Sequence, residues 1–176
     1  AQVTLVTGPS SLPDPTGVLT LRVETSAEMK GRVLPLLPDV DVLIFAAAVA
    51  DFRPDDPKGE KLKRSRKGES LELRLHPTDD IARASLEGRK VGSVALGFAL
   101  ETENLKANAR RKLKEKGFNL IAANSPTEPG SGFDVDTNRV TILDTEGGVE
   151  QLPLLPKDEV AEKLLDRVTP LLGDPV

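Results

Sequence analysis

The stretch Val42-Leu43-Ile44-Phe45-Ala46-Ala47-Ala48 is apolar without interruption over the length of one β-strand. A strand with one wet face alternates apolar and polar residues, so a continuous apolar run is typical of a parallel strand covered on both faces. Small residues finish the run, and Asp51 follows shortly after it. We therefore expect a central strand of a parallel sheet, with polar residues just beyond its carboxyl end.

Patterns of strands and helices alternate on both sides of this run. Strand-like runs occur at residues 3–7, 17–24, 71–75, 91–98 and 120–123, a hairpin pattern at 139–143 and 149–152, and helical patterns at 25–37, 79–86, 105–116 and 157–172. This order predicts an α/β fold, a Rossmann-like doubly wound and mostly parallel sheet with an appended antiparallel hairpin. Residues 1–176 are predicted to form a single domain, and the polar residues 51–67 a long loop.

Local residues predict where the first helix begins and where a later helix stops. Thr25 and Glu28 have the Thr-x-x-Glu spacing of a capping box, and Pro35 is expected to disturb the last turn of the helix that follows. Gly117 is expected to end the helix that begins near Leu105. The 71–75 run alternates leucine with polar residues and therefore predicts a half-buried strand.

Composition excludes several classes of function. The formal net charge is −4 with acids and bases intermixed, and aromatic residues are few, so the sequence indicates no nucleic-acid surface. There is no cysteine and a single histidine, His76, which we expect at the surface, so any metal would be a hard ion on oxygen ligands. The chain contains no apolar stretch of membrane-spanning length and predicts a cytoplasmic protein without a membrane partner.

In a doubly wound sheet, ligands bind outside the carboxyl ends of the strands. Asp51 follows a strand there and can meet a ribose hydroxyl or a hydrated Mg²⁺ ion, or simply cap the loop. The alanines around Ala47 leave room for a flat base or for a closely packed helix. Phe98 can stack on a base or belong to the core. Asp79 and Asp80 open a helix and are candidates for nucleotide contacts or for ordinary capping acids.

Two groups of lysines are candidates for phosphate binding. Lys61 and Lys63 lie on one side of an extended segment, where they can neutralise a polyphosphate or form a solvated charge run. Lys112 and Lys116 are one helical turn apart near a helix end, where cations also interact favourably with the helix dipole.

A nicotinamide- or flavin-binding reductase is the first alternative. Its classical fingerprint needs Gly-x-Gly-x-x-Gly at the entry to a helix after the first strand. This chain has Gly8-Pro9-Ser10-Ser11-Leu12-Pro13 at that place, with neither the glycines nor a helix entry. The sequence therefore disfavours that class.

Six motifs resemble, in order along the chain, those of one enzyme family. They are Val3-Thr4-Leu5-Val6-Thr7-Gly8-Pro9, Ala47-Ala48-Val49-Ala50-Asp51-Phe52-Arg53, Lys61-Leu62-Lys63-Arg64, Gly97-Phe98-Ala99-Leu100-Glu101-Thr102, Ala109-Arg110-Arg111-Lys112-Leu113, and Gly132-Phe133 with Asp136 and Asn138. The family is that of the phosphopantothenoylcysteine synthetases, and the resemblance covers essentially the whole chain.

The resemblance implies a CTP-dependent ligation in coenzyme A biosynthesis. In the family, 4′-phosphopantothenate attacks CTP to give an acyl cytidylate and pyrophosphate, and L-cysteine then displaces CMP. The implied cofactor is Mg²⁺, with CTP as co-substrate, and the implied assembly is a homodimer.

The resemblance also implies roles by motif position. Lys61 would be catalytic in the activating step, Ala47 and Phe98 would lie around the cytosine, and Asp51 would lie near the ribose or hold Mg²⁺. The further nucleotide-binding positions are Asp79, Asp80, Ile81 and Ala82 along the nucleotide, and Lys112 and Lys116 at the triphosphate.

The chain departs from the family pattern in two places. Thr78-Asp79-Asp80-Ile81 stands where the family usually has Asn-Pro-Asp-Ile, and Asn124 is followed by Ser125-Pro126 where Asp-Val is usual. The family's first strand and helix, with an asparagine used in the second half-reaction, and the decarboxylase often fused upstream are not found before Ala1. We therefore expect an N-terminally incomplete domain, with a nucleotide-binding fragment without turnover as the second alternative.

Overall fold

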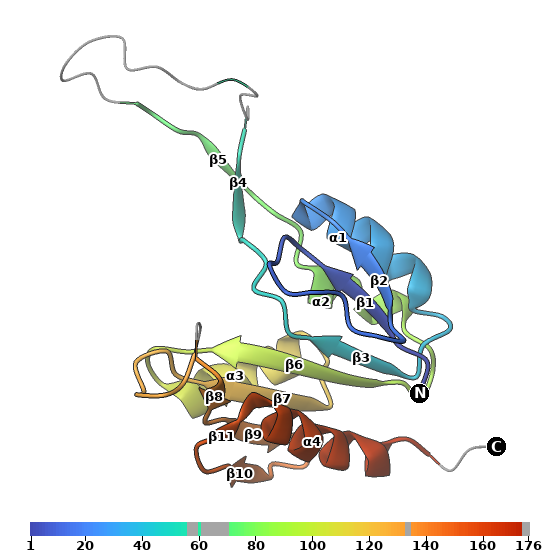
Figure 1. The fold of residues 1–176 in the computed structure, drawn as a ribbon, viewed down its shortest axis with the longest axis vertical. Coiled ribbons are helices and arrows are strands. Elements are labelled where there is room, and N and C mark those ends of the chain that lie inside the picture. Colours follow the sequence, from blue (N-terminus) through green and yellow to red (C-terminus); the bar gives the residue numbers. More distant parts are fainter. Residues whose placement is uncertain (56–59, 61–70, 133–134, 174–176) are drawn as a thin grey trace. The chain divides into compact units, whose positions relative to one another are not determined.

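The computed structural model describes residues 1–55, 60, 71–132 and 135–173 (Figure 1). The chain divides into two compact units, one formed by Ala1–Arg32 with Ala48–Ile81 and the other by Val33–Ala47 with Ala82–Val176. Lys61 and Lys63 lie outside the described residues.

The larger unit is built on a five-stranded sheet with the strand order β10-β9-β7-β6-β3. The strands are β3 (Val42–Phe45), β6 (Val94–Leu100), β7 (Leu120–Asn124), β9 (Thr141–Asp144) and β10 (Val149–Gln151). β3, β6 and β7 are parallel, whereas β9 and β10 form an antiparallel hairpin beside β7. The predicted α/β fold, with a mostly parallel sheet and an appended hairpin, is confirmed.

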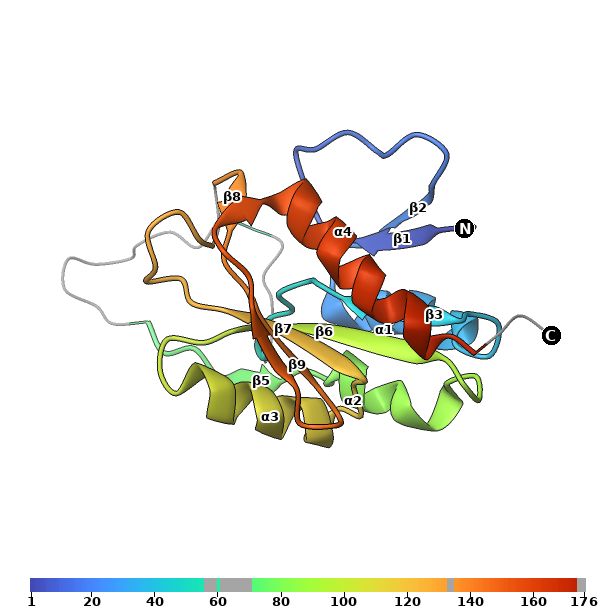
Figure 2. The same cartoon turned by 90° about the horizontal axis from the view of Figure 1, so that it is seen from below.

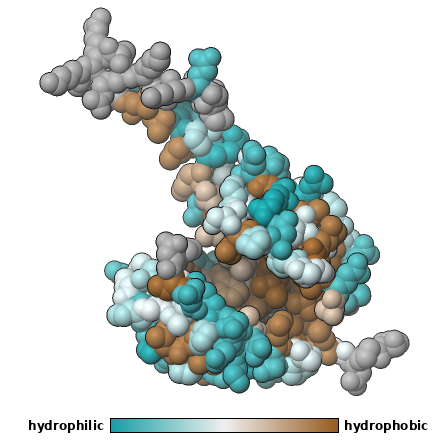
Figure 3. Space-filling view, in the orientation of Figure 1, coloured by the Kyte–Doolittle hydropathy of each residue, from teal (hydrophilic) through white to brown (hydrophobic). Residues whose placement is uncertain are grey.

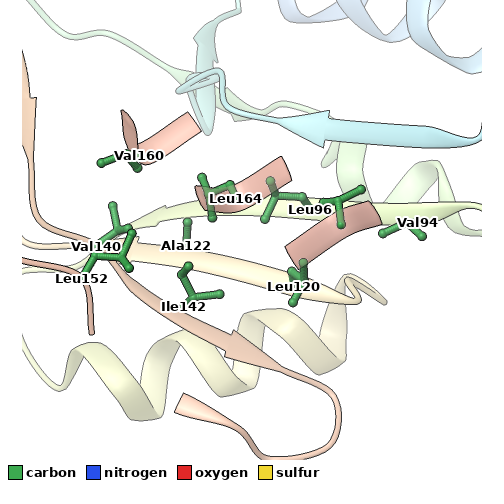
Figure 4. Packing of buried hydrophobic residues seen from close by; sticks show 10 residues of the cluster. Val94, Leu96, Leu120, Ala122, Val140, Ile142, Leu152, Val160 and Leu164 are labelled. Carbon is green, nitrogen blue, oxygen red and sulfur yellow. The ribbon is translucent and has the colours of Figure 1, made fainter. Parts of the chain in front are cut away.

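Helices cover both faces of this sheet, because the strand residues alternate between two apolar clusters (Figure 2). One face packs against α4 (Lys157–Val168) through Val160, Leu164 and Val168 (Figure 4). The other face packs against α3 (Leu105–Glu115) through Ala109 and Leu113. Helix residues three and four apart lie on one side of a helix, which explains both sets.

A glycine and a phenylalanine interlock on the α3 face of the sheet. A Cβ atom at Gly97, in β6, would lie only 2.1 Å from Cε2 of Phe118. The Phe118 ring, just after α3, also tilts against Phe45 at the end of β3, with ring centroids 5.6 Å apart. Any side chain larger than hydrogen at position 97 would therefore displace the ring.

Arg89 joins the two helices of that face. Its guanidinium donates five hydrogen bonds, to the Ser85 hydroxyl and to the carbonyl oxygens of Ala82, Lys116 and Gly117. Ala82 belongs to α2 (Ile81–Ala84), and Lys116 follows α3 directly. Burial lowers the pKa of the guanidinium from its usual value, although an arginine remains charged at neutral pH. Arg89 thus satisfies carbonyls at two helix ends that would otherwise lack donors.

The smaller unit contains a parallel pair of strands and a capped helix. β1 (Thr4–Thr7) pairs with β2 (Leu19–Arg22), and α1 (Ser26–Val33) follows. The Glu28 N–H donates to the Thr25 hydroxyl at 3.1 Å, and the Glu28 carboxylate accepts from the Glu24 N–H at 3.0 Å. The predicted capping box is therefore confirmed, and the turn around Pro35 is a 3₁₀ helix (η1, Leu34–Leu36), as expected for a disturbed helix end.

A two-stranded ribbon in the smaller unit corrects the sequence prediction. β4 (Phe52–Pro54) lies inside the segment predicted as a loop and pairs antiparallel with β5 (Leu75–Pro77). Phe52 is opposite Pro77 and Pro54 is opposite Leu75, so these side chains share one face. Leu71, Leu73 and Leu75 were predicted to be half-buried in a strand, but they are 66%, 65% and 52% exposed. Only Leu75 belongs to the observed ribbon, and residues 71–74 precede it without regular structure.

The position of β3 is a second correction. It is the last strand in the order of its sheet, and Ile44 is 49% exposed, whereas the apolar run predicted a central strand. Figure 3 shows hydrophobic residues at the surface in the region of β3. An apolar run reports how the faces of a strand are expected to be covered, but it does not report how many neighbours lie along its edges.

Short elements complete the described chain. They are the paired strands β8 (Thr137–Asn138) and β11 (Leu155–Pro156) and the 3₁₀ helices η2 (Leu86–Gly88) and η3 (Thr169–Leu171). No helix in the described ranges has the length and apolar character needed to span a membrane.

Candidate functional site

The carboxyl ends of the parallel strands β3, β6 and β7 lie at the same end of the larger unit's sheet, which we call its carboxyl edge. Phe45 of β3 is in register with Gly97 of β6, and Leu100 of β6 is in register with Asn124 of β7. The backbone after β3, which carries Ala47, and the end of β6, which carries Phe98, therefore continue toward the same edge. This is the edge where a doubly wound sheet binds ligands.

Ala47 and Phe98 differ in their surroundings. Ala47 is exposed in a segment without regular structure, so its backbone is open to a ligand. Phe98 is half-buried, and its side chain packs against the cluster on the α4 face. This packing is what the core interpretation of Phe98 predicted, and the residue keeps partial exposure, which contact with a base requires.

A buried carboxylate lies at the same edge and holds Lys112. Glu101 follows β6 directly, and its Oε1 atom is 2.7 Å from Nζ of Lys112. The Asn108 side chain donates to Oε2 of Glu101 at 3.1 Å and to the carbonyl oxygen of Glu103 at 2.9 Å. The network of Glu101, Asn108 and Lys112 thus fixes one of the predicted phosphate-binding cations at the carboxyl edge.

Lys116 is placed differently from Lys112. It caps the carboxyl end of α3, about 6 Å further along the helix axis, and its carbonyl oxygen accepts a hydrogen bond from Arg89. The chain then turns through Gly117, which has a φ angle of 55°, into the amino end of β7. The two lysines that sequence spacing groups together are therefore held by different structures.

The smaller unit brings Asp51 and Asp79 into neighbouring segments. The Thr78 N–H donates to the carbonyl oxygen of Asp51 at 2.9 Å. The Asp79 carboxylate accepts from Nζ of Lys30 at 2.8 Å. This hydrogen bond, with the charge of Lys30, holds the pKa of Asp79 below its usual value. Asp79 therefore presents a carboxylate already partnered by a cation.

The residues after Asp79 offer mainly backbone to a ligand. Asp80 is exposed and has an interaction partner in the structure. Ile81 and Ala82 are buried, with 6% and 8% exposure. Buried apolar side chains cannot contact a polar ligand, so any nucleotide contact made by Ile81 or Ala82 would use main-chain atoms.

Asp51 is the predicted ligand for Mg²⁺. In the described part of the chain, no three acidic or histidine side chains cluster in a way that would hold a metal. Mg²⁺ usually keeps several waters and binds one or two carboxylates together with substrate phosphates. An exposed Asp51 fits that mode, in which the nucleotide supplies further oxygen ligands.

An open groove of about 470 Å³ lies beside the first turn of α3. Its lining consists of Asn104, Leu105, Lys106, Ala107, Thr141 and Gln151. This groove contains none of the residues predicted from the sequence, so it does not define the predicted site.

Glu101 and Asn108 were given no role by the sequence reasoning. Glu101 obeys the same rule that singled out Asp51, because it follows a buried strand directly. Asn108 is one helical turn before Lys112, which is a second available signal.

Comparison with known families decides what the chain is similar to. The family described as "DNA/pantothenate metabolism flavoprotein C-terminal domain" matches residues 1–171. The chain belongs to this family. The resemblance inferred from the six motifs is thereby confirmed at the level of the family.

Two curated relatives and one solved structure give the scale of the similarity. The chain is 39% identical over 173 residues to a cysteine/cysteine sulfinic acid decarboxylase from an unknown prokaryotic organism, and 37% identical over 172 residues to the coenzyme A biosynthesis bifunctional protein CoaBC of Bacillus subtilis (strain 168). These matches cover 98% and 97% of this chain, but the chain spans only 48% and 42% of the relatives. The crystal structure of the C-terminal domain of a CoaBC protein superposes with a TM-score of 0.79 at 36% identity, covering 99% of this chain and 76% of that one.

Proposed function

We propose that this chain is the ligase domain that joins 4′-phosphopantothenate to L-cysteine, using CTP, in coenzyme A biosynthesis. The observation that carries the proposal is the family match over residues 1–171, together with 36% identity to the C-terminal domain of a CoaBC protein. Because the chain spans less than half of its curated relatives, the decarboxylase activity in the name of one of them is not carried over.

The proposed reaction has two steps. A carboxylate oxygen of 4′-phosphopantothenate attacks the α-phosphorus of CTP, and the bond to pyrophosphate breaks. The cysteine amine then attacks the acyl carbon, the amide bond forms, and CMP leaves with the bonding electrons while the amine loses its proton. A carboxylate is a poor acyl donor, and the mixed anhydride supplies the leaving group that it lacks.

The residues divide between these tasks by charge and position. Lys61 neutralises the phosphoryl charge that develops in the first step, and Lys112 and Lys116 hold the triphosphate. Ala47 and Phe98 surround the cytosine, and the backbone of residues 79–82 follows the nucleotide. Mg²⁺, when bound at Asp51 and the phosphates, supplies further charge neutralisation.

This proposal predicts that CTP with Mg²⁺ raises the melting temperature more than ATP with Mg²⁺ does. A site that hydrogen-bonds the edge of one base leaves polar groups unpaired with another base. At one hundred times its dissociation constant, CTP would add about 2.7 kcal/mol of stability, which thermal-shift measurements detect easily.

The same measurement with NADPH and FMN serves as the control for the reductase alternative. Equal shifts with CTP and ATP would contradict the preference for cytidine. A larger shift with NADPH or FMN would replace the ligase proposal by a reductase. CTP binding without pyrophosphate release would support a nucleotide-binding domain without turnover.

The proposal includes a homodimer in the cytoplasm, and the ribbon of β4 and β5 supports the dimer. Its apolar face carries Phe52, Pro54, Leu75 and Pro77, and Leu71 and Leu73, which precede β5 in the chain, are exposed as well. Figure 3 shows hydrophobic residues at the surface along this ribbon. A continuous exposed apolar face of this kind marks an interaction surface in soluble proteins. A second copy presents the same face and can cover it symmetrically.

Leu73→Glu is expected to convert the dimer to a monomer, because it places a charge in the centre of the covered face. Molar mass from size-exclusion chromatography with light scattering measures this change. Arg74→Glu is the matched control, since it introduces the same residue on the opposite face and is expected to remain dimeric. A wild-type protein of monomeric mass would contradict the dimer.

A further inference from the structure

We propose that Glu101 is a positioning residue, which holds the Lys112 ammonium at the carboxyl edge of the sheet where the nucleotide phosphates bind. This inference rests on the proposed function, because it concerns how the same site binds CTP. Glu101 stands in the fourth family motif, but neither the motif comparison nor the proposed mechanism gives it a role.

Glu101 is itself held in place from two sides. Its backbone N–H donates to the carbonyl oxygen of Asn124 at 3.0 Å, which ties it to the end of β7. Its carboxylate accepts from the Asn108 side chain at 3.1 Å, and the side chain is only 11% exposed. The carboxylate is therefore a fixed point at the sheet edge.

Lys112 needs such a fixed point because its charge sits on a long flexible side chain. It extends from the last turn of α3, and a lysine loses considerable rotamer freedom when its ammonium is held in one place. Glu101 holds that ammonium at 2.7 Å while the side chain remains 30% exposed. An ammonium has three donors, so pairing with Glu101 leaves donors for phosphate oxygens.

The sign of the effect separates positioning from simple charge repulsion. Repulsion alone predicts that removing the Glu101 carboxylate strengthens CTP binding, because it removes a negative charge near the phosphates. Positioning predicts weaker CTP binding, because without Glu101 the Lys112 side chain would lose its rotamer freedom only when CTP binds.

The test is a double-mutant cycle with Glu101→Ala, Lys112→Ala and the double variant, measuring the dissociation constant, KM and kcat for CTP. We expect each single variant to raise the dissociation constant and KM about tenfold, with kcat within about twofold of wild type. The double variant is expected to be no weaker than Lys112→Ala, since both substitutions remove one interaction. Glu101→Gln keeps the acceptor for Asn108 and is expected to show a smaller loss.

Glu115→Ala is the matched control, because Glu115 pairs with Arg111 on the same helix at 3.0 Å but is half exposed. Unchanged or tighter CTP binding by Glu101→Ala, or losses that add in the double variant, would overturn the inference while leaving the proposed function intact. Absence of CTP binding by the wild-type protein would overturn the proposed function and this inference together. Glu101→Gln provides the same readout if Glu101→Ala does not fold.

Discussion

Lys61→Gln is expected to abolish acyl-cytidylate formation and to leave the melting temperature unchanged. On the proposed mechanism, the lysine neutralises charge that develops as the carboxylate attacks the α-phosphorus. Removing one such stabilising group commonly costs about a hundredfold to a thousandfold in rate. Pyrophosphate release measures this step alone, since it requires CTP and 4′-phosphopantothenate but not cysteine.

Lys163→Gln is the control for this substitution, because Lys163 is an exposed lysine on α4 with no proposed role. Normal pyrophosphate release by Lys61→Gln would return the 61–64 run to a solvated charge cluster. A large fall in melting temperature would instead give Lys61 a structural role.

Arg89→Met is expected to lower the free energy of unfolding by about 3 kcal/mol. Methionine occupies part of the space beside Phe45 and Phe118, but it leaves the carbonyl oxygens of Ala82, Lys116 and Gly117 without their donor. The Ser85 hydroxyl, which is fully buried, also loses this donor, whereas the Gly117 carbonyl is exposed to water. A buried polar group left without a partner costs about 1–3 kcal/mol. For a chain of this size, the loss corresponds to a fall in melting temperature of roughly 6–12 °C.

Arg111→Met is the matched control, because Arg111 forms an exposed ion pair with Glu115 that is expected to contribute at most about 1 kcal/mol. Arg89→Lys restores the charge but cannot reproduce the planar fork, so an intermediate stability is expected. If Arg89→Met and Arg111→Met melt together, the two helix ends joined by Arg89 do not depend on it.

Local signals predicted the elements of the larger unit well. The buried strand predicted at 91–98 is found as β6 at Val94–Leu100, and the helix predicted at 105–116 is found as α3 at Leu105–Glu115. These signals succeed because burial leaves a mark on the sequence: both faces of β6 are buried, which gives an apolar run, and one side of α3 is buried, which gives a helical period. The strand predicted at 42–48 was found as β3, but it lies at the end of the strand order and Ile44 is 49% exposed.

The ribbon and the site could not be predicted from the periodic pattern of apolar residues, because they depend on contacts between residues distant in sequence. The strand predicted at 71–75 overlaps the observed β5 (Leu75–Pro77) only at Leu75, and Leu71, Leu73 and Leu75 are exposed. No local pattern tells whether an apolar face meets the chain's own core or remains exposed. The grouping of Lys112 with Lys116 was a matter of helix spacing alone. The structure separates them because Glu101, distant in sequence from both, pairs with Lys112, and Arg89 holds the backbone of Lys116.

The interlock of Gly97 and Phe118 restricts the order in which this sequence can evolve. A side chain at position 97 cannot appear while the Phe118 ring remains, because the two would occupy the same volume. Losing the ring first opens a cavity and removes its contacts with Phe45 and Arg89. Every single-step path thus crosses a destabilised intermediate, which makes the two positions epistatic. Variation at the neighbouring Phe98, whose side chain points to the opposite face, is free of this constraint.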